Sequence, residues 1–420
     1  MKKKVKEKLI NFFKSKELAL PRKRDDTPNF EDYLKKLFEN HEKLIGYLCE
    51  LPIDKWNPRD GYEGNYKYIM KEITGGKDVS KKISDGILEC LKEYFNGRVS
   101  DAYIKLKEML DDTGVKGYLK RLISIDVDKN SNYAPFSDLY RVTVTDEDLS
   151  EKPLRLFHVP YNLREKMGTN RYSIPGFPCL YIGGSAELCW KELNMPQNGK
   201  LYIAKYDAIP SKLRFLNFAY TPQSWIKLLA VDGNICIARH KELLVGHALC
   251  WPLIAACSII RKYPDSKFAP EYVIPQMLLQ WITDPKRITD SKKNNNEIDG
   301  IRYFSTRFFD HSLTPKPTVN YVFPAIKSDS DKMYSTKLAE KFKITKPILI
   351  DKINDSYLFS RAEFMLENSP SKPLLDVINK KDLECKINKM SIRMKRLEKM
   401  PIRIKRIEKI LKELKNKKLK

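Results

Sequence analysis

The chain has 420 residues, a length that allows two or three domains with substantial buried cores. Hydrophobic residues make up 42% of the chain and charged residues 31%, with 24 Pro and 17 Gly, and this balance excludes collagen-like, disulfide-scaffold and wholly disordered chains. The formal net charge of +24 raises the question of a nucleic-acid or membrane-surface partner.

The positive charge gathers at the two ends of the chain. Residues 1–24 carry ten Lys and Arg against two Glu, and residues 385–420 carry fifteen against three Glu, so that residues 25–384 keep a net charge of only +4. Any attraction to phosphate backbones or anionic membranes therefore belongs to the termini. A purely solubilising tail is the alternative interpretation.

Membrane, secretion and metal signals are weak. No apolar run reaches the roughly 18 residues needed to span a bilayer, and we expect no signal peptide. The eight cysteines contain no C-x-x-C pair and form no short-spaced cluster with histidine, so we expect reduced thiols and no metal site. These features predict a cytoplasmic protein.

The first part of the chain predicts helices. A basic N-terminal segment, residues 1–27, precedes a helical domain, residues 28–130, in which apolar side chains recur at helical spacing. The predicted helical stretches are Phe30–Leu48, Ile83–Phe95, Tyr103–Leu110 and Tyr118–Ile123. Residues 128–138 are rich in turn formers and form the expected boundary.

After this boundary the pattern changes to short strands mixed with helices, which predicts an α+β fold. The expected strands are Leu139–Val144, Leu180–Ile182, Leu201–Ala204, Gly300–Ser305 and Thr318–Phe323. Between them we expect a helix at Ala186–Leu193 and two buried helices at Ala248–Ile260 and Glu271–Ile282. Residues 331–384 read as an extension of mixed short helices without clear chemistry.

The last segment, residues 385–420, has a tandem ten-residue repeat, in which Ser391–Met400 is followed directly by Pro401–Ile410. Isoleucines and leucines between basic residues predict a cationic amphipathic helix. Such a tail suits an acidic protein, a nucleic acid or an anionic membrane surface, and packing on its own body is the alternative.

The most informative stretch is Asn170–Leu193, where a Pro- and Gly-punctuated loop leads into a strand, a Gly-Gly turn and a helix. Ser185 is placed to cap that helix, and Glu192 lies about two turns inside it. A strand, turn and helix of this length fold Tyr181 and Glu192 back towards one site. The five histidines are scattered, which does not support a Ser-His or Cys-His nucleophile.

These residues resemble the RES domain, a family named for its Arg, Glu and Ser whose members break down NAD and often act as toxins of toxin-antitoxin pairs. Four blocks occur in the family's order over residues 136–326: Leu139-Tyr140-Arg141; Arg171-Tyr172-Ser173 with Pro175-Gly176; Leu180-Tyr181-Ile182 running on to Glu192; and Asp299–Ser305. Residues 319–323 resemble the closing strand. One departure is the long stretch between Glu192 and Ser305.

The resemblance implies a catalytic RES domain with a mixed sheet similar to that of ADP-ribosyltransferases, with NAD as substrate and no metal. Glu192 is the candidate for stabilising an oxocarbenium-like ribose. Arg141 and Arg171 suit the pyrophosphate, because a guanidinium offers paired donors to phosphate oxygens. Tyr181, or less favourably Tyr172, is the candidate for stacking on nicotinamide, and Ser305 for a hydrogen bond to ribose or phosphate.

The family implies an NAD phosphorylase, with inorganic phosphate as acceptor, or an NAD glycohydrolase, with water, and an antitoxin protein as a possible partner. Two alternatives stay open. One is an ADP-ribosyltransferase that modifies a macromolecule with the same residues. The other is a non-enzymatic nucleic-acid or membrane binder that works through its basic ends.

Overall fold

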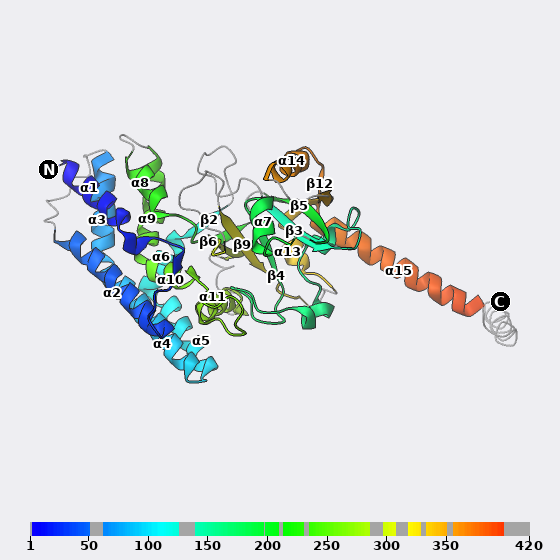
Figure 1. Ribbon diagram of the computed structural model, residues 1–420, viewed down its shortest axis with the longest axis horizontal. Helices are drawn as coiled ribbons and strands as arrows, with labels where there is room; N and C mark the ends of the chain where they lie inside the picture. The colour runs from blue at the N-terminus through cyan, green and yellow to red at the C-terminus, as the bar shows by residue number, and fades with distance from the viewer. Residues whose placement is uncertain are drawn as a thin grey trace, which may run out of the picture.

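The computed structural model describes residues 2–50, 62–125, 139–196, 198–209, 213–230, 235–285, 297–307, 318–328, 333–350 and 356–398 (Figure 1). Helices gather at one end of the molecule, a mixed sheet lies in the middle, and one long helix leaves the opposite side. The predicted α+β class is confirmed. The expected boundary at residues 128–138 falls outside the described residues.

The helices of the N-terminal part bury one face each. They are α1 (Lys2–Lys14), α2 (Phe30–Cys49), α3 (Tyr62–Gly75), α4 (Lys77–Phe95), α5 (Val99–Asp111) and α6 (Thr113–Arg121). The helices predicted at Phe30–Leu48 and Ile83–Phe95 are confirmed, and their apolar stripes are buried. The stretch predicted as a helix up to Ile123 ends earlier, because Ile123 begins strand β2 (Ile123–Ile125).

The long stretch between Glu192 and Ser305 completes this helical body. It supplies α8 (Pro222–Ala230), α9 (Ile235–Leu249), α10 (Trp251–Ala256) and α11 (Val273–Ile282), whose apolar side chains share one hydrophobic cluster with the N-terminal helices. On α2, His41 lies 3.0 Å from the Ala248 carbonyl and stacks on Trp251 at 4.8 Å. Segments far apart in the sequence therefore form a single core.

The helix predicted over Ala248–Ile260 is broken in two. Helix α9 ends at Leu249, and α10 begins at Trp251 with Pro252 in its first turn. Proline has no backbone N–H and cannot continue the preceding helix, which explains the break. The run then ends in strand β7 (Ile259–Ile260), which pairs in parallel with β1 (Arg22–Lys23) of the N-terminal segment.

The main sheet has ten strands in the order β12-β10-β5-β3-β4-β9-β8-β6-β2, with β11 also pairing β5. The strands not yet given are β3 (Leu139–Thr145), β4 (Cys179–Gly183), β5 (Lys200–Ala208), β6 (Arg214–Asn217), β8 (Gly300–Phe304), β9 (Val319–Pro324), β10 (Phe342–Thr345), β11 (Ile348–Ile350) and β12 (Ser371–Pro373). The five predicted strands are all present. Strands β6 and β8 pair in parallel and β4 and β9 antiparallel, so the sheet is mixed.

The C-terminal extension differs from the mixed helices expected for residues 331–384. It contains α13 (Thr336–Ala339) and α14 (Ser356–Glu367), but also β10, β11 and β12. Both β10 and β11 pair with β5, the third strand from one edge of the sheet. These strands have only three or four residues, too few for a period of two to be recognised in the sequence.

Helix α15 (Leu374–Glu398) projects away from the sheet (Figure 1). Its first turn is buried at Leu374, whereas Leu383, Ile387 and Met390 further along are more than half exposed. The predicted tail helix is thus present up to Glu398, and residues 399–420, with the second repeat unit, lie outside the described residues. Within the described ranges, no helix combines the length and apolar character needed to cross a membrane.

The remaining helical segments are single 3-10 turns. They are η1 (Lys16–Leu18), η2 (Pro153–Leu156), η3 (Tyr161–Lys166) and η4 (Pro270–Tyr272). The turn η4 leads directly into α11, so the core helix predicted at Glu271–Ile282 begins as a 3-10 turn, and Pro275 lies in the first turn of α11.

Candidate functional site

The site is built around the turn from β4 into helix α7 (Ala186–Glu192). Ser185 caps this helix, because its hydroxyl accepts a hydrogen bond of 3.1 Å from the Leu188 amide. A Cβ atom on Gly183 would lie 2.7 Å from Sγ of Cys189, so only glycine lets the helix approach the strand this closely. Glu192 is the last residue of α7.

Two side chains from neighbouring strands hold the carboxylate of Glu192. Its Oε1 accepts a hydrogen bond of 2.6 Å from the Ser305 hydroxyl and another of 2.6 Å from Nδ2 of Asn320. Ser305 follows β8, and Asn320 lies in β9, which pairs with both β8 and β4. The sheet therefore brings Glu192 and Ser305 into direct contact.

A third contact comes from Arg307. Its Nε lies 3.8 Å from Oε2 of Glu192, and its guanidinium donates to the Glu192 carbonyl at 3.0 Å and to the Asn194 side chain. The side chain of Arg307 is 45% exposed and that of Glu192 28% exposed. The Glu192 side chain is therefore partly exposed, as a group that meets a ligand must be.

Arg171 lies next to this cluster and is only 7% exposed. It donates to the carbonyls of Cys257 and Ile259 at 3.2 and 3.0 Å, and to the Thr306 hydroxyl at 2.7 Å. These three bonds to described residues use three of its five N–H donors. Its guanidinium also lies 5.0 Å from the ring centre of Tyr272, in a cation–π contact.

The segment after β8 connects the carboxylate to Arg171. Ser305 contacts Glu192, and Thr306, the next residue, contacts Arg171. Burial raises the pKa of the nearby Tyr303 well above its usual value, the Glu192 charge raises it further, and the Arg171 charge opposes this. The acidic and basic side chains thus face one site.

Arg141 approaches from β3. It donates to the Tyr181 carbonyl at 3.5 Å, and no carboxylate of the described residues lies within 4 Å of it. The Arg141 side chain keeps some solvent contact. Desolvation by the surrounding protein nevertheless lowers the pKa of Arg141, and electrostatic interactions with Tyr206, Cys189 and Tyr181 partly oppose this shift. Among the described residues, the hydrogen bond to Tyr181 is the one recorded for this guanidinium. A desolvated guanidinium favours an anion as a partner.

The two candidate tyrosines differ in burial. Tyr181 is half-buried, and its hydroxyl lies 2.9 Å from Oγ of Ser173. Tyr172 is 1% exposed, and its ring packs on that of Tyr303 at 4.6 Å. Because Tyr172 presents almost no surface, Tyr181 is the better candidate for stacking on a ligand.

The structure thus brings Glu192, Ser305 and Asn320 into contact, and Thr306, the residue after Ser305, contacts Arg171. Arg141 contacts the backbone of Tyr181. The roles of the predicted residues towards a ligand stay predictions. Sequence reasoning missed Asn320, Thr306, Arg307 and Tyr272. Asn320 carried a usable signal, since it is a polar residue within an otherwise apolar buried strand.

The cysteine and the histidines near the core behave as packing residues. Burial raises the pKa of Cys189 to about 12, so this thiol is protonated at neutral pH. Burial lowers the pKa of both His41 and His247 to about 3, which leaves them uncharged. His311 lies outside the described residues.

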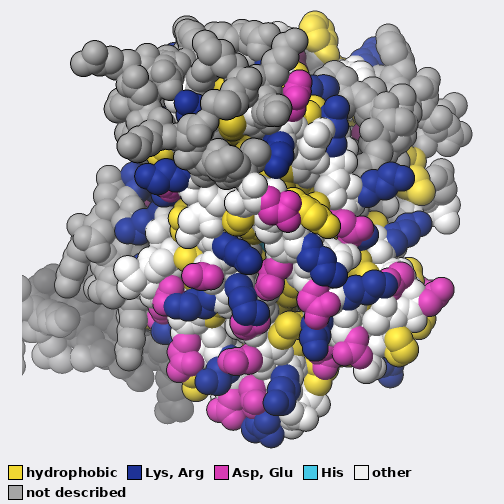
Figure 2. All heavy atoms as spheres, turned by 90° about the vertical axis from the view of Figure 1, so that its left-hand side faces the viewer, with side chains coloured by type: hydrophobic (Ala, Val, Ile, Leu, Met, Phe, Trp, Pro, Cys, Tyr) yellow, Lys and Arg dark blue, Asp and Glu magenta, His cyan; other side chains and the backbone are white. Residues whose placement is uncertain are grey.

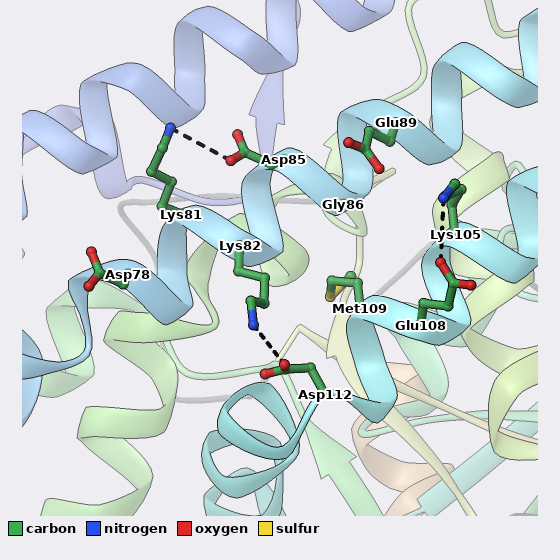
Figure 3. Close-up of a pocket in the computed structure, with 10 residues that line it drawn as sticks. All are labelled: Asp78, Lys81, Lys82, Asp85, Gly86, Glu89, Lys105, Glu108, Met109 and Asp112. Atoms are coloured by element: carbon green, nitrogen blue, oxygen red, sulfur yellow. Dashed lines mark hydrogen bonds and ion pairs between the residues drawn. The ribbon is translucent and has the colours of Figure 1, made fainter.

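A surface hollow of about 450 Å³ lies between α4 and α5, away from the predicted site residues (Figure 3). Ion pairs line it, among them Lys82–Asp112 at 2.6 Å and Lys105–Glu108 at 3.5 Å. Figure 2 shows that Lys and Arg are interspersed with Asp and Glu over the described part of the surface at the left-hand side of Figure 1. Such mixed charge does not favour a nucleic-acid interface here.

The fold and site together define an α+β protein with a carboxylate that Ser305 and Asn320 hold and that Arg307 approaches. The chain is similar to a protein of Bacillus subtilis (strain 168) named putative toxin YopC, with 27% identity over 314 residues, which cover 71% of this chain and 68% of that protein. The matched length exceeds that of residues 136–326, so the similarity extends beyond the RES-like part. No family model and no solved structure matches the chain.

Proposed function

We propose that this protein is an NAD-consuming enzyme of the RES type, which cleaves the bond between nicotinamide and ribose and acts as a toxin. The observation that carries the proposal is the carboxylate of Glu192, held by Ser305 and Asn320 with Arg307 3.8 Å from its other oxygen. The name of the similar Bacillus protein supports the toxin part.

Glu192 has the chemistry for the ribose. As the C1–N bond breaks, its electron pair leaves with nicotinamide and positive charge develops on the ribose ring. A carboxylate that is already oriented stabilises this charge without having to reorganise. The bonds from Ser305 and Asn320 fix Oε1, so Oε2 is the oxygen directed at the sugar.

The two arginines supply charge for the pyrophosphate. Among the described residues, hydrogen bonds occupy three of the five N–H donors of Arg171 and one of those of Arg141. Arg171 is buried and Arg141 is partly buried. An ion pair with phosphate is stronger in such surroundings than at an open surface. Tyr181 has the exposed surface to stack on the nicotinamide ring.

The acceptor for the ADP-ribosyl group decides the reaction type. A phosphate or water oxygen forms the new bond to C1, and water loses a proton in doing so. NAD labelled in its adenine, incubated with the purified protein with and without phosphate, separates the outcomes: free ADP-ribose indicates water, a phosphorylated product indicates phosphate, and labelled macromolecules indicate a transferase. Intact NAD under all conditions would contradict the proposal.

A further inference from the structure

The C-terminal extension packs directly on the helix that carries Glu192. Helices α14 and α7 pack together on one face of β3 and β5 in a shared hydrophobic cluster. The helical side chains buried in this cluster are Ala186, Phe359, Ala362 and Leu366. The rings of Trp190 and Phe359 lie 5.4 Å apart. The residues that form α14 lie outside the RES-like stretch 136–326.

One hydrogen bond anchors the start of α7 to this extension. Oε1 of Glu363 accepts a bond of 2.7 Å from the Ala186 amide, 177 positions earlier in the chain. Glu363 is 8% exposed and Ala186 is fully buried. The first amides of a helix have no partner within the helix, and a carboxylate there also interacts favourably with the helix dipole.

The other end of the same helix presents Glu192. From Ala186 to Glu192 the helix is about 9 Å long at 1.5 Å per residue, so a tilt at its start moves the carboxylate at its end. Misplacement by about 1 Å can cost on the order of 100-fold in rate. Glu363 therefore acts on the site without touching the substrate.

We propose that Glu363 is a positioning residue for Glu192, and that α14 belongs to the catalytic unit. This inference rests on the proposed function. Glu363→Ala removes the acceptor, Glu363→Gln keeps an oxygen that can accept the same bond, and Glu367→Ala is the matched control, since Glu367 is an exposed carboxylate one turn further along α14.

The test measures kcat and KM for nicotinamide release from NAD, together with amide hydrogen exchange of residues 186–192. We expect Glu363→Ala to lower kcat at least tenfold, to keep KM within twofold of the wild type and to speed amide exchange in α7. Glu363→Gln should retain at least a third of the wild-type kcat. Glu367→Ala should match the wild type. Unchanged kcat and unchanged exchange in Glu363→Ala would overturn the inference, as would an equal loss of kcat in Glu363→Gln.

The two proposals fail in different ways. If the wild type releases no nicotinamide, the proposed function fails, and hydrogen exchange still decides whether Glu363 holds α7. If the wild type is active and Glu363→Ala has normal kcat, only the positioning role fails. If Glu363→Ala does not fold, Glu363→Asp takes its place in the test. The shorter aspartate side chain does not reach the Ala186 amide, and Glu363→Gln is then compared with Glu363→Asp.

Discussion

Ser305 donates a hydrogen bond of 2.6 Å to Oε1 of Glu192, although the two residues lie 113 positions apart in the sequence. Most of the sequence between them belongs to the helical body. The two residues meet because β9 pairs with both β4 and β8 in the sheet. The bond is therefore a property of the whole fold, and it fixes the carboxylate in one orientation.

Loss of either donor to Glu192 should slow the reaction. A hydrogen bond to a charged group contributes about 1.5–3 kcal/mol, so we expect Ser305→Ala and Asn320→Ala each to lower kcat by about tenfold or more. Asn320→Asp should be worse than Asn320→Ala, because it places a second negative charge beside Glu192. Rates of nicotinamide release at saturating NAD measure this, and equal rates for the three variants and the wild type would contradict it.

Arg141 should act mainly on binding. Arg141→Lys keeps a charge but loses the planar pair of donors, so we expect KM for NAD to rise at least tenfold, by about 1.4 kcal/mol, with a smaller change in kcat. Arg155→Lys is the control, since Arg155 is an exposed arginine paired with Glu147. Titration calorimetry with ADP-ribose provides a second readout, and unaltered affinity in Arg141→Lys would count against a phosphate-binding role.

The buried ion pair between Arg24 and Glu271 should stabilise the attachment of the N-terminal segment. The two side chains lie 3.4 Å apart and are 5% and 1% exposed. Removing one partner leaves a buried charge, so Arg24→Met should lower the free energy of unfolding by about 3–5 kcal/mol. Lys36→Ala removes an exposed pair with Asp25 and should cost less than about 1 kcal/mol. Urea unfolding of both variants compares them, and similar midpoints would contradict the prediction.

Acid should destabilise the fold through two buried histidines. The unfolded chain binds a proton on each imidazole below a pH of about 6.5, whereas folded His41 and His247 do so only near pH 3. The unfolded state therefore binds more protons between these values, and stability falls as the pH is lowered through this window by about 1.4 kcal/mol per pH unit for each histidine. His41→Gln should flatten the slope of unfolding free energy against pH, whereas His240→Gln, a partly exposed control, should not.

The basic tail should be separable from catalysis. Residues 399–420 carry ten Lys and Arg against two Glu, and they follow a helix that already points away from the sheet. Deleting these residues should leave the rate of nicotinamide release within twofold of the wild type. If the full chain binds duplex DNA with an affinity that falls steeply between 50 and 200 mM salt, the deletion should abolish that binding. Salt-sensitive DNA binding that survives the deletion would place the interface elsewhere.

The five central strands and the buried helices were predictable, because their apolar patterns are local. The RES-like blocks also named Glu192 and Ser305, and the structure brings these two side chains into contact, while their roles stay predictions. The strands of the C-terminal extension were not predictable, because runs as short as Ile348–Ile350 have no measurable period. Their role depends on pairing with β5, which is a tertiary contact.

Most of the hydrogen-bond partners of the site residues could not be predicted from the sequence. The bonds of Arg171 go to backbone carbonyls of Cys257 and Ile259, and carbonyls carry no sequence signal. The contact of Glu363 with Ala186 joins segments 177 positions apart. Asn320 is the exception, because a single amide within a buried apolar strand requires a polar partner.

The most direct test of the account compares nicotinamide release from NAD by the wild type, Glu192→Gln and Glu187→Gln. Glu187 lies on the same helix and pairs with Lys191 at 2.7 Å, so its variant controls for changes to α7. We predict release by the wild type and Glu187→Gln, and a loss of at least about 100-fold in Glu192→Gln. Equal release by Glu192→Gln and the wild type would contradict the central role of this carboxylate, and no release by any of the three would contradict NAD cleavage itself.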